Sequence, residues 1–216
     1  MSTSAAPESA LLDLALSVRT GPRQTRDDTR SRILVESIQL FASHGYAGTS
    51  MREIGAAAGI QAASIYAHFG SKQQLQLATI DEAGRIFIDE VVAPALLAPP
   101  GLAQIRALCD SFFDHLTRRT FPGGCFFAGA VLEVGTRPGP VKQRIVEFQQ
   151  MFVGLIRDFA VAAIEKGELV DEVPAHLAFE INGLLLAADA GFVLTDDPAS
   201  LEIPRAVLRR RLATAH

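Results

Sequence analysis

Apolar residues recur every three or four positions along most of the chain, the period of an amphipathic α-helix. Pro and Gly interrupt this pattern, and no strand-length alternation or internal repeat stands out. The pattern predicts an all-α fold. We expect a helix near residues 27–44 that Gly45 ends, and a long helix from Ser71 towards Val92 that ends before Pro94. Further helices are predicted near residues 101–119, 125–135, 140–166, 175–194 and 202–213.

The segment between Thr49 and Phe69 predicts two short helices joined by a tight turn. Ser50 is a favourable N-cap residue, and Glu53 stands three positions later, the spacing of a capping box. Gly59 can adopt the left-handed backbone angles that end a helix. Two short helices with this connection are typical of a helix-turn-helix, whose second helix enters the DNA major groove.

The residues around this segment resemble the N-terminal domain of the TetR (tetracycline-repressor) family of bacterial transcription regulators. The matching runs are I-L-V-E-S-I-Q-L-F-A-S-H-G-Y-A-G-T-S, from Ile33 to Ser50, and I-Y-A-H-F-G-S-K-Q-Q-L, from Ile65 to Leu75. The resemblance implies an N-terminal three-helix helix-turn-helix domain, joined by a connecting helix to a helical ligand-binding and dimerisation domain. The expected divisions are a tail at 1–26, the DNA-binding domain at 27–72 and the effector-binding and dimerisation domain at 73–216.

The resemblance also implies which residues contact DNA. The positions expected to contact phosphate are Thr49, Arg52, Tyr66, His68 and Lys72, and those expected nearest the bases are Gln61, Ala62, Ala63 and Ser64. Many relatives carry Ser or Thr followed by Lys or Arg where this chain has Gln61-Ala62-Ala63. Base readout would therefore rest on Gln61 and on apolar contact with thymine methyl groups.

Several residues assigned to DNA contact also have a simpler structural explanation. Tyr66 could be an aromatic residue at the edge of the core, and His68 a solvated residue at a helix end. Lys72 could be an ordinary surface charge, and Gln61 could only cap its helix. The arginines of the tail either reach a minor groove or belong to a solvated tail.

The helix expected at 175–194 is apolar on nearly all sides, so it must be buried on several of them. The runs Gly123–Lys142, Gly167–Val170 and Leu177–Leu186 resemble the C-terminal domain of one branch of the TetR family. There, this helix and the last one form a four-helix bundle across a two-fold axis, which implies a homodimer. Burial within a single subunit is the alternative.

Phenylalanine is abundant in the predicted body, and the resemblance implies that such helices enclose a small-molecule pocket. The expected lining residues are Phe87, Phe112, Phe113, His115, Phe126, Phe127, Phe152 and Asn182. Ordinary core packing also explains most of the phenylalanines. A pocket of this kind would select a small, mainly apolar effector.

Composition and charge further limit the class of protein and its location. Hydrophobic residues make up 49% of the 216 residues, and the net charge is −4. Between Arg19 and Leu75, seven Lys or Arg stand against four acidic residues, a mildly basic region that suits phosphate binding. The lack of a signal-peptide pattern and of a long charge-free apolar run favours a cytoplasmic protein with no membrane partner. Cys109 and Cys125 fit a reducing compartment, with a redox switch as a minor alternative.

Three classes of function remain. The first is a transcription regulator, usually a repressor, that binds double-stranded DNA at a near-palindromic operator and responds to an effector. The second is a DNA-binding protein without an effector, such as an architectural protein or a constitutive regulator. The third, an all-helical enzyme, is disfavoured because the chain has no G-x-S-x-G or H-E-x-x-H motif and no convincing pair of acids. No cofactor and no metal cluster are expected.

Overall fold

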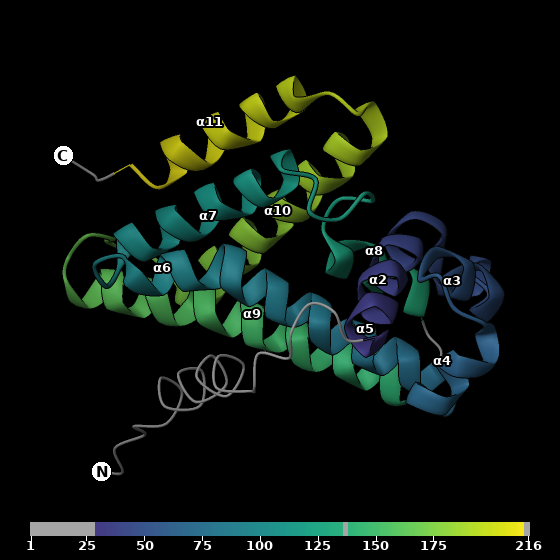
Figure 1. The fold of residues 1–216 in the computed structure, drawn as a ribbon. Coiled ribbons are helices and arrows are strands. Elements are labelled where there is room, and N and C mark those ends of the chain that lie inside the picture. The colour runs from purple at the N-terminus through teal and green to yellow at the C-terminus, as the bar shows by residue number, and fades with distance from the viewer. Residues whose placement is uncertain (1–28, 136–137, 214–216) are drawn as a thin grey trace, which may run out of the picture.

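A computed structural model describes residues 29–135 and 138–213, and this part of the chain contains helices and no strand. Figure 1 shows a small head of three helices at one end of a larger helical body. The predicted tail at 1–26 lies outside the described residues. The head consists of α2 (Thr29–Gly48), α3 (Met51–Ala57) and α4 (Ala62–Phe69).

Caps define the short helices of the head, as predicted. Ser50 Oγ accepts the Glu53 N–H at 3.2 Å, and the Glu53 carboxylate accepts the Ser50 N–H at 2.6 Å. These bonds hold the pKa of Glu53 below its usual value. Gly59 has a φ of 69°, the left-handed angle expected for the turn. The helix-turn-helix is therefore confirmed at the level of its backbone.

The first helix differs from the prediction at its C-terminal end. Gly45 does leave helical geometry, with φ 70° and ψ 167°, but a further turn follows it up to Gly48. The kink turns the segment that contains Tyr46 and Ala47 towards the body. Gly45 therefore ends the first helical segment of α2, as predicted, and the difference is the short helical turn that follows it.

The connecting helix begins where predicted, with the Ser71 hydroxyl accepting the Gln74 N–H at 3.1 Å. It runs through α5 (Lys72–Phe87), a π-helical turn η1 (Ile88–Val92) and α6 (Ala93–Leu97). The prediction that it ends before Pro94 is wrong. Pro94 stands in the first turn of α6, where its missing N–H is not needed, and the Ala93 N–H bonds back to Ile88 O across the π turn.

The body helices match the predicted ranges to within a few residues. They are α7 (Leu102–Thr117), α8 (Phe126–Val134), α9 (Pro140–Glu165), α10 (Pro174–Thr195) and α11 (Glu202–Arg211). A short 3-10 turn, η2 (Pro198–Leu201), was not predicted. The core extends from Ile33 and Ile54 in the head to Ile156 and Ile181 in the body.

Helix α10 is only partly covered. Leu177, Ile181 and Leu185 are buried, whereas a stripe of the opposite face is exposed. This α10 stripe consists of Phe179, Gly183, Leu186, Ala187, Ala190 and Leu194. The length of α10 and its mean hydropathy of 1.6 would also suit a membrane span, as they suit many helices of packed cores.

Candidate nucleic-acid interface and ligand cavity

Helix α4 faces the protein with two residues and solvent with most of the others. Ile65 and Phe69 are buried, and Phe69 also lies under the Arg30 guanidinium, 4.8 Å from its ring centroid. Gln61, Ala63, Ser64, Tyr66 and His68 are exposed, and Ala62 is half-buried. The structure thus brings most of the predicted DNA-facing residues to one open surface. Arg52, on α3, is also exposed.

The exposure of Tyr66 and the capping of α4 bear on the simpler structural roles of Tyr66 and Gln61. Tyr66 is 48% exposed, so about half of its surface faces solvent even if the rest lies at the edge of the core. Gln61 occupies the N-cap position of α4, but its side chain makes no capping hydrogen bond. Both side chains therefore remain available to an external partner.

Thr49 differs from the expectation. Its side chain is 1% exposed, and its hydroxyl donates to Gly45 O at 2.8 Å and lies 3.2 Å from Leu40 O. A hydroxyl that is enclosed and already donates to backbone carbonyls cannot reach a phosphate. Thr49 instead fixes the end of α2 against the start of α3, and its side chain is not exposed for a phosphate contact, contrary to the expectation.

Lys72 joins the start of α5 to the kinked end of α2. Its Nζ donates to Tyr46 O at 2.6 Å and lies 4.1 Å from the centroid of the Tyr46 ring. The side chain is half-buried. These contacts fix the position of the ammonium group beside the helix-turn-helix, so its place depends on Tyr46.

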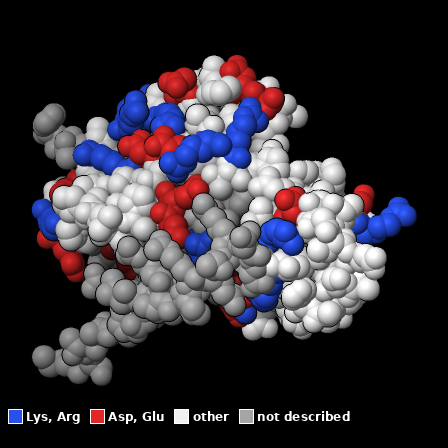
Figure 2. Space-filling view, in the orientation of Figure 1, with Lys and Arg blue, Asp and Glu red and all other residues white. Residues whose placement is uncertain are grey.

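Charge is distributed unevenly over the face in Figure 2. Acidic and basic side chains alternate over the body, whereas the head at the right is mostly uncharged, with a few separate basic and acidic side chains. Part of the mixed pattern comes from ion pairs of α11, where Arg211 contacts Glu172 at 2.5 Å and Glu180 at 2.9 Å. Some of the charges of the body therefore pair with one another within the chain.

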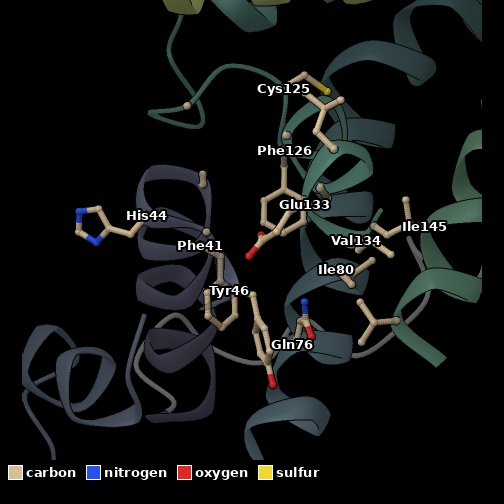
Figure 3. A pocket seen from close by; sticks show the side chains of 17 residues that line it. Phe41, His44, Tyr46, Gln76, Ile80, Cys125, Phe126, Glu133, Val134 and Ile145 are labelled. Carbon is tan, nitrogen blue, oxygen red and sulfur yellow. The ribbon is translucent and has the colours of Figure 1, made fainter. Parts of the chain in front are cut away.

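A cavity of about 510 Å³ lies where the head meets the body. Its walls come from the C-terminal part of α2, from α5, from α8 with the loop before it, and from α9 (Figure 3). Apolar side chains dominate the lining, among them Phe41, Ile80, Phe126 and Ile145. Residues of the head and the body thus line one cavity that is partly open to solvent.

The predicted ligand residues do not form this cavity, apart from Phe126. Phe87 lies at the centre of an aromatic cluster and meets Phe112, Phe127 and Phe152 edge-on, with ring centroids 5.4–6.3 Å apart. Phe113 is also buried in the core. Asn182 accepts a hydrogen bond from Gln149 Nε2 at 3.1 Å. Core packing, the simpler reading, accounts for these residues, because edge-to-face rings fill the space that a ligand would need.

His115 is buried and belongs to a partly buried hydrogen-bond chain between body and head. Its Nδ1 lies 2.7 Å from a carboxylate oxygen of Glu90, in η1, and the same oxygen accepts the Thr120 hydroxyl at 2.8 Å. Thr120 O in turn accepts from Gln39 Nε2, in α2, at 3.3 Å. Burial lowers the pKa of His115, although Glu90 opposes the shift. His115 is therefore structural here.

Two contacts between head and body involve residues that the sequence does not single out. The Glu133 carboxylate, in α8, accepts the Ala47 N–H at 3.0 Å. Gly123 packs against the backbone of α2 so closely that a Cβ on it would stand 2.1 Å from Ala42 O. A glycine before a helix and a glutamate near its end give no sequence signal of such contacts.

The start of α8 is fixed by α10. The Asp189 carboxylate accepts the Cys125 N–H at 2.6 Å, and burial raises the pKa of Asp189 to about 6. Cys109 and Cys125 are free and buried, and desolvation raises the pKa of each thiol to about 12. Thiols of this kind are poor nucleophiles, which disfavours the redox-switch alternative. Within the described residues, no cluster of three or more His, Cys, Asp or Glu could hold a metal ion.

Two family models match the chain. Residues 33–79 match the model described as bacterial regulatory proteins of the tetR family. Residues 101–208 match the model of the tetracyclin repressor-like C-terminal domain. The first match contains the helix-turn-helix, and the second contains all of α7 to α10.

Individual relatives agree with the models. The chain is 30% identical over 98 residues to the HTH-type transcriptional activator FasR of Mycolicibacterium smegmatis, which is 45% of each protein. The chain thus spans about half the length of the first curated relatives it matches.

Solved structures share the fold. A TetR transcriptional regulator from Chloroflexus aurantiacus superposes with a TM-score of 0.79 at 27% identity, over 85% of this chain and 93% of that one. AibR, solved with isovaleryl coenzyme A and operator DNA, superposes with a TM-score of 0.71 over 85% of this chain and 97% of that one. At 22% identity, the second match speaks for the fold alone. With both of its domains matched by models of DNA-binding regulators, and not of enzymes, the chain belongs to the TetR family of bacterial transcriptional regulators.

Proposed function

We propose that this regulator is a homodimeric repressor that a small, mainly apolar effector releases from a near-palindromic operator. The observation that carries the proposal is the exposed face of α4, where Gln61, Ala63, Ser64 and Tyr66 stand clear of the core. Small residues at the start of the helix allow its backbone to approach a major groove closely. Arg52 and Lys72 are the basic residues assigned to phosphate.

The α10 stripe supports the homodimer. Phe179 is 78% exposed and Leu194 is 87% exposed on one face of a mainly apolar helix. Contiguous apolar surface of this kind marks an interface, and the small residues between these two allow close helix contact. Association through the same face of two copies would relate two α4 helices by a two-fold axis, which is the symmetry of a palindrome.

Effector control is supported by the cavity between head and body. A ligand that favours one arrangement of head and body would change the spacing of two recognition helices by differential binding alone. The required coupling is about 1–3 kcal/mol. AibR, of the same fold, was solved with both an acyl coenzyme A and operator DNA. The relatives include both a named activator and a named repressor.

The alternative is a DNA-binding protein without an effector. Selection of bound DNA from a random pool tests the core of the proposal, and recovery of a near-palindrome with half-sites at least one helical turn apart is the expected result. Failure to enrich any sequence would refute sequence-specific binding. A thermal-shift screen of small molecules, with each hit retested for operator release, then separates the two functions. The alternative predicts hits that leave DNA affinity unchanged, or none.

A further inference from the structure

The cavity between head and body, the junction cavity, carries an inference about the effector itself. It touches the kinked end of α2 on one side and α8 on the other, so any occupant contacts the DNA-binding head directly (Figure 3). Its volume of about 510 Å³ lies within the range of small-molecule sites. The aromatic cluster around Phe87, by contrast, is filled by its own rings.

The polar groups of the junction cavity select the chemistry of the ligand. Figure 3 shows the Glu133 carboxylate between α8 and the Phe41–Tyr46 wall, with the Gln76 amide at the other end. His44 points away from the space. Among the described lining residues, Glu133 is then the one full charge that faces the cavity, at its solvent-exposed edge. An anionic ligand would be repelled there, and a hydrogen-bond donor, above all a cationic one, would find an acceptor.

The same carboxylate holds the head in place. Glu133 accepts the Ala47 N–H at 3.0 Å and lies against Gly45, where a Cβ would stand 3.0 Å from Oε1. The neighbouring Tyr46 accepts a hydrogen bond from Lys72 Nζ through its carbonyl, and its ring lies against the same ammonium group. A donor that competes for Glu133 therefore acts on Ala47 and Tyr46, and through Tyr46 on the lysine assigned to phosphate.

We infer that the junction cavity binds a small, mainly apolar molecule that carries an amine. This amine displaces the Ala47 N–H from the Glu133 carboxylate and so weakens the contact between head and body. The inference rests on the proposed function, since it names the effector site and the effector class of that regulator. It places the effector outside the phenylalanine cluster that the sequence predicted.

Three matched probes test the chemistry: 4-biphenylmethylamine, 4-biphenylmethanol and 4-biphenylcarboxylic acid. Binding to the full chain is measured by ligand-observed NMR, alongside a fragment library sorted into amines, neutral molecules and acids. We expect at least tenfold tighter binding of the amine than of the acid, and hits enriched in amines. Equal binding of amine and acid, or no binding by any fragment, would overturn the inference.

Two variants locate the site. Gly129 lines the cavity and a Cβ there meets no atom within 4 Å, so Gly129→Trp should fill the space without disturbing α8 and abolish binding of the amine. Gly129→Ala is the matched control, since a methyl group leaves most of the volume. Glu133→Gln keeps an acceptor for Ala47 but removes the charge, and should equalise the affinities for the amine and the alcohol.

Measurements of operator binding distinguish a failure of this inference from a failure of the proposed function. If the wild-type chain binds no specific DNA, the proposed regulator is wrong. If it binds an operator and ligands release it, but Gly129→Trp leaves every ligand affinity unchanged, the regulator stands and the junction cavity is not its effector site.

Discussion

Lys72 combines an observed contact within the fold with a predicted contact to DNA phosphate. Its Nζ contacts Tyr46 O and the Tyr46 ring, which orders a flexible side chain before DNA arrives. An ordered cation loses less conformational entropy on binding a phosphate than a free one does. The contact with Tyr46 is thus compatible with the phosphate assignment, which remains a prediction.

Replacing Lys72 by Ala should weaken binding to all DNA sequences alike. One phosphate contact is lost, so the slope of log affinity against log salt should fall by about one. Fluorescence anisotropy on specific and random duplexes between low and moderate salt measures both quantities. Lys72→Arg keeps the charge and serves as the control. Unchanged affinity and slope in Lys72→Ala would show that Lys72 does not contact phosphate.

Asp189 should make the stability of the protein depend on pH. Burial raises its pKa from 3.8 to about 6, so the folded state holds this proton more tightly than the unfolded chain. The resulting stabilisation is fully present below about pH 4 and is lost as the pH rises through 6, by on the order of 3 kcal/mol.

The variant Asp189→Asn keeps an acceptor for the Cys125 N–H without the charge. We expect it to be more stable than the wild type at pH 7 and similar at pH 4, as measured by denaturant unfolding at each pH. A constant difference in the free energy of unfolding across this range would contradict the assignment.

At the scale of elements, the caps of the head are separate stabilising units. Ser50→Ala removes the side-chain half of the capping box and should lower the free energy of unfolding by about 1 kcal/mol. Ser64→Ala, at an exposed serine of α4, is the matched control for loss of a hydroxyl. Equal urea midpoints for the two variants would mean that the box contributes nothing.

Elements with local causes were predictable from the sequence. The Ser50–Glu53 box, the Ser71 cap and the Gly59 turn each depend on residues a few positions apart, and all three are present. Pro94 misled the prediction because the π turn before it moves the hydrogen-bond register. That turn contains Glu90, whose partners His115 and Thr120 lie 25 and 30 residues away. No local pattern reveals such partners.

The candidate site was less predictable for a related reason. Periodicity shows that Phe87 and Phe152 point inward, but a ring that packs and a ring that lines a cavity give the same pattern. The junction cavity exists because the kink at Gly45 brings α2 against α8, and Gly123 allows the close approach. Those contacts join residues about 80 positions apart. Only the folded chain brings them together.

For the whole molecule, the α10 stripe predicts how two copies associate. Ala187→Glu places a charge at the centre of the stripe, where an unpaired buried charge is costly, so the dimer should dissociate. Ala57→Glu adds the same charge to an exposed alanine of α3 and should leave assembly unchanged. Light scattering at micromolar concentration should give twice the 23.1 kDa chain mass for the wild type and one chain mass for Ala187→Glu. One chain mass for the wild type would exclude the proposed dimer.

The wide turn η1 accommodates one extra residue between the two halves of the connecting helix, α5 and α6. Each residue of an α-helix advances it by about 100°, and a π turn accommodates one residue more than an α turn does. Deleting a single residue there, such as Asp89, would convert the π turn into an α turn and leave the orientation of the head nearly unchanged, whereas a deletion within α5 would rotate Lys72 and the head by about 100° around the helix axis. The direction in which two heads face a duplex is therefore encoded in the residue count of α5, as much as in any side chain that touches DNA.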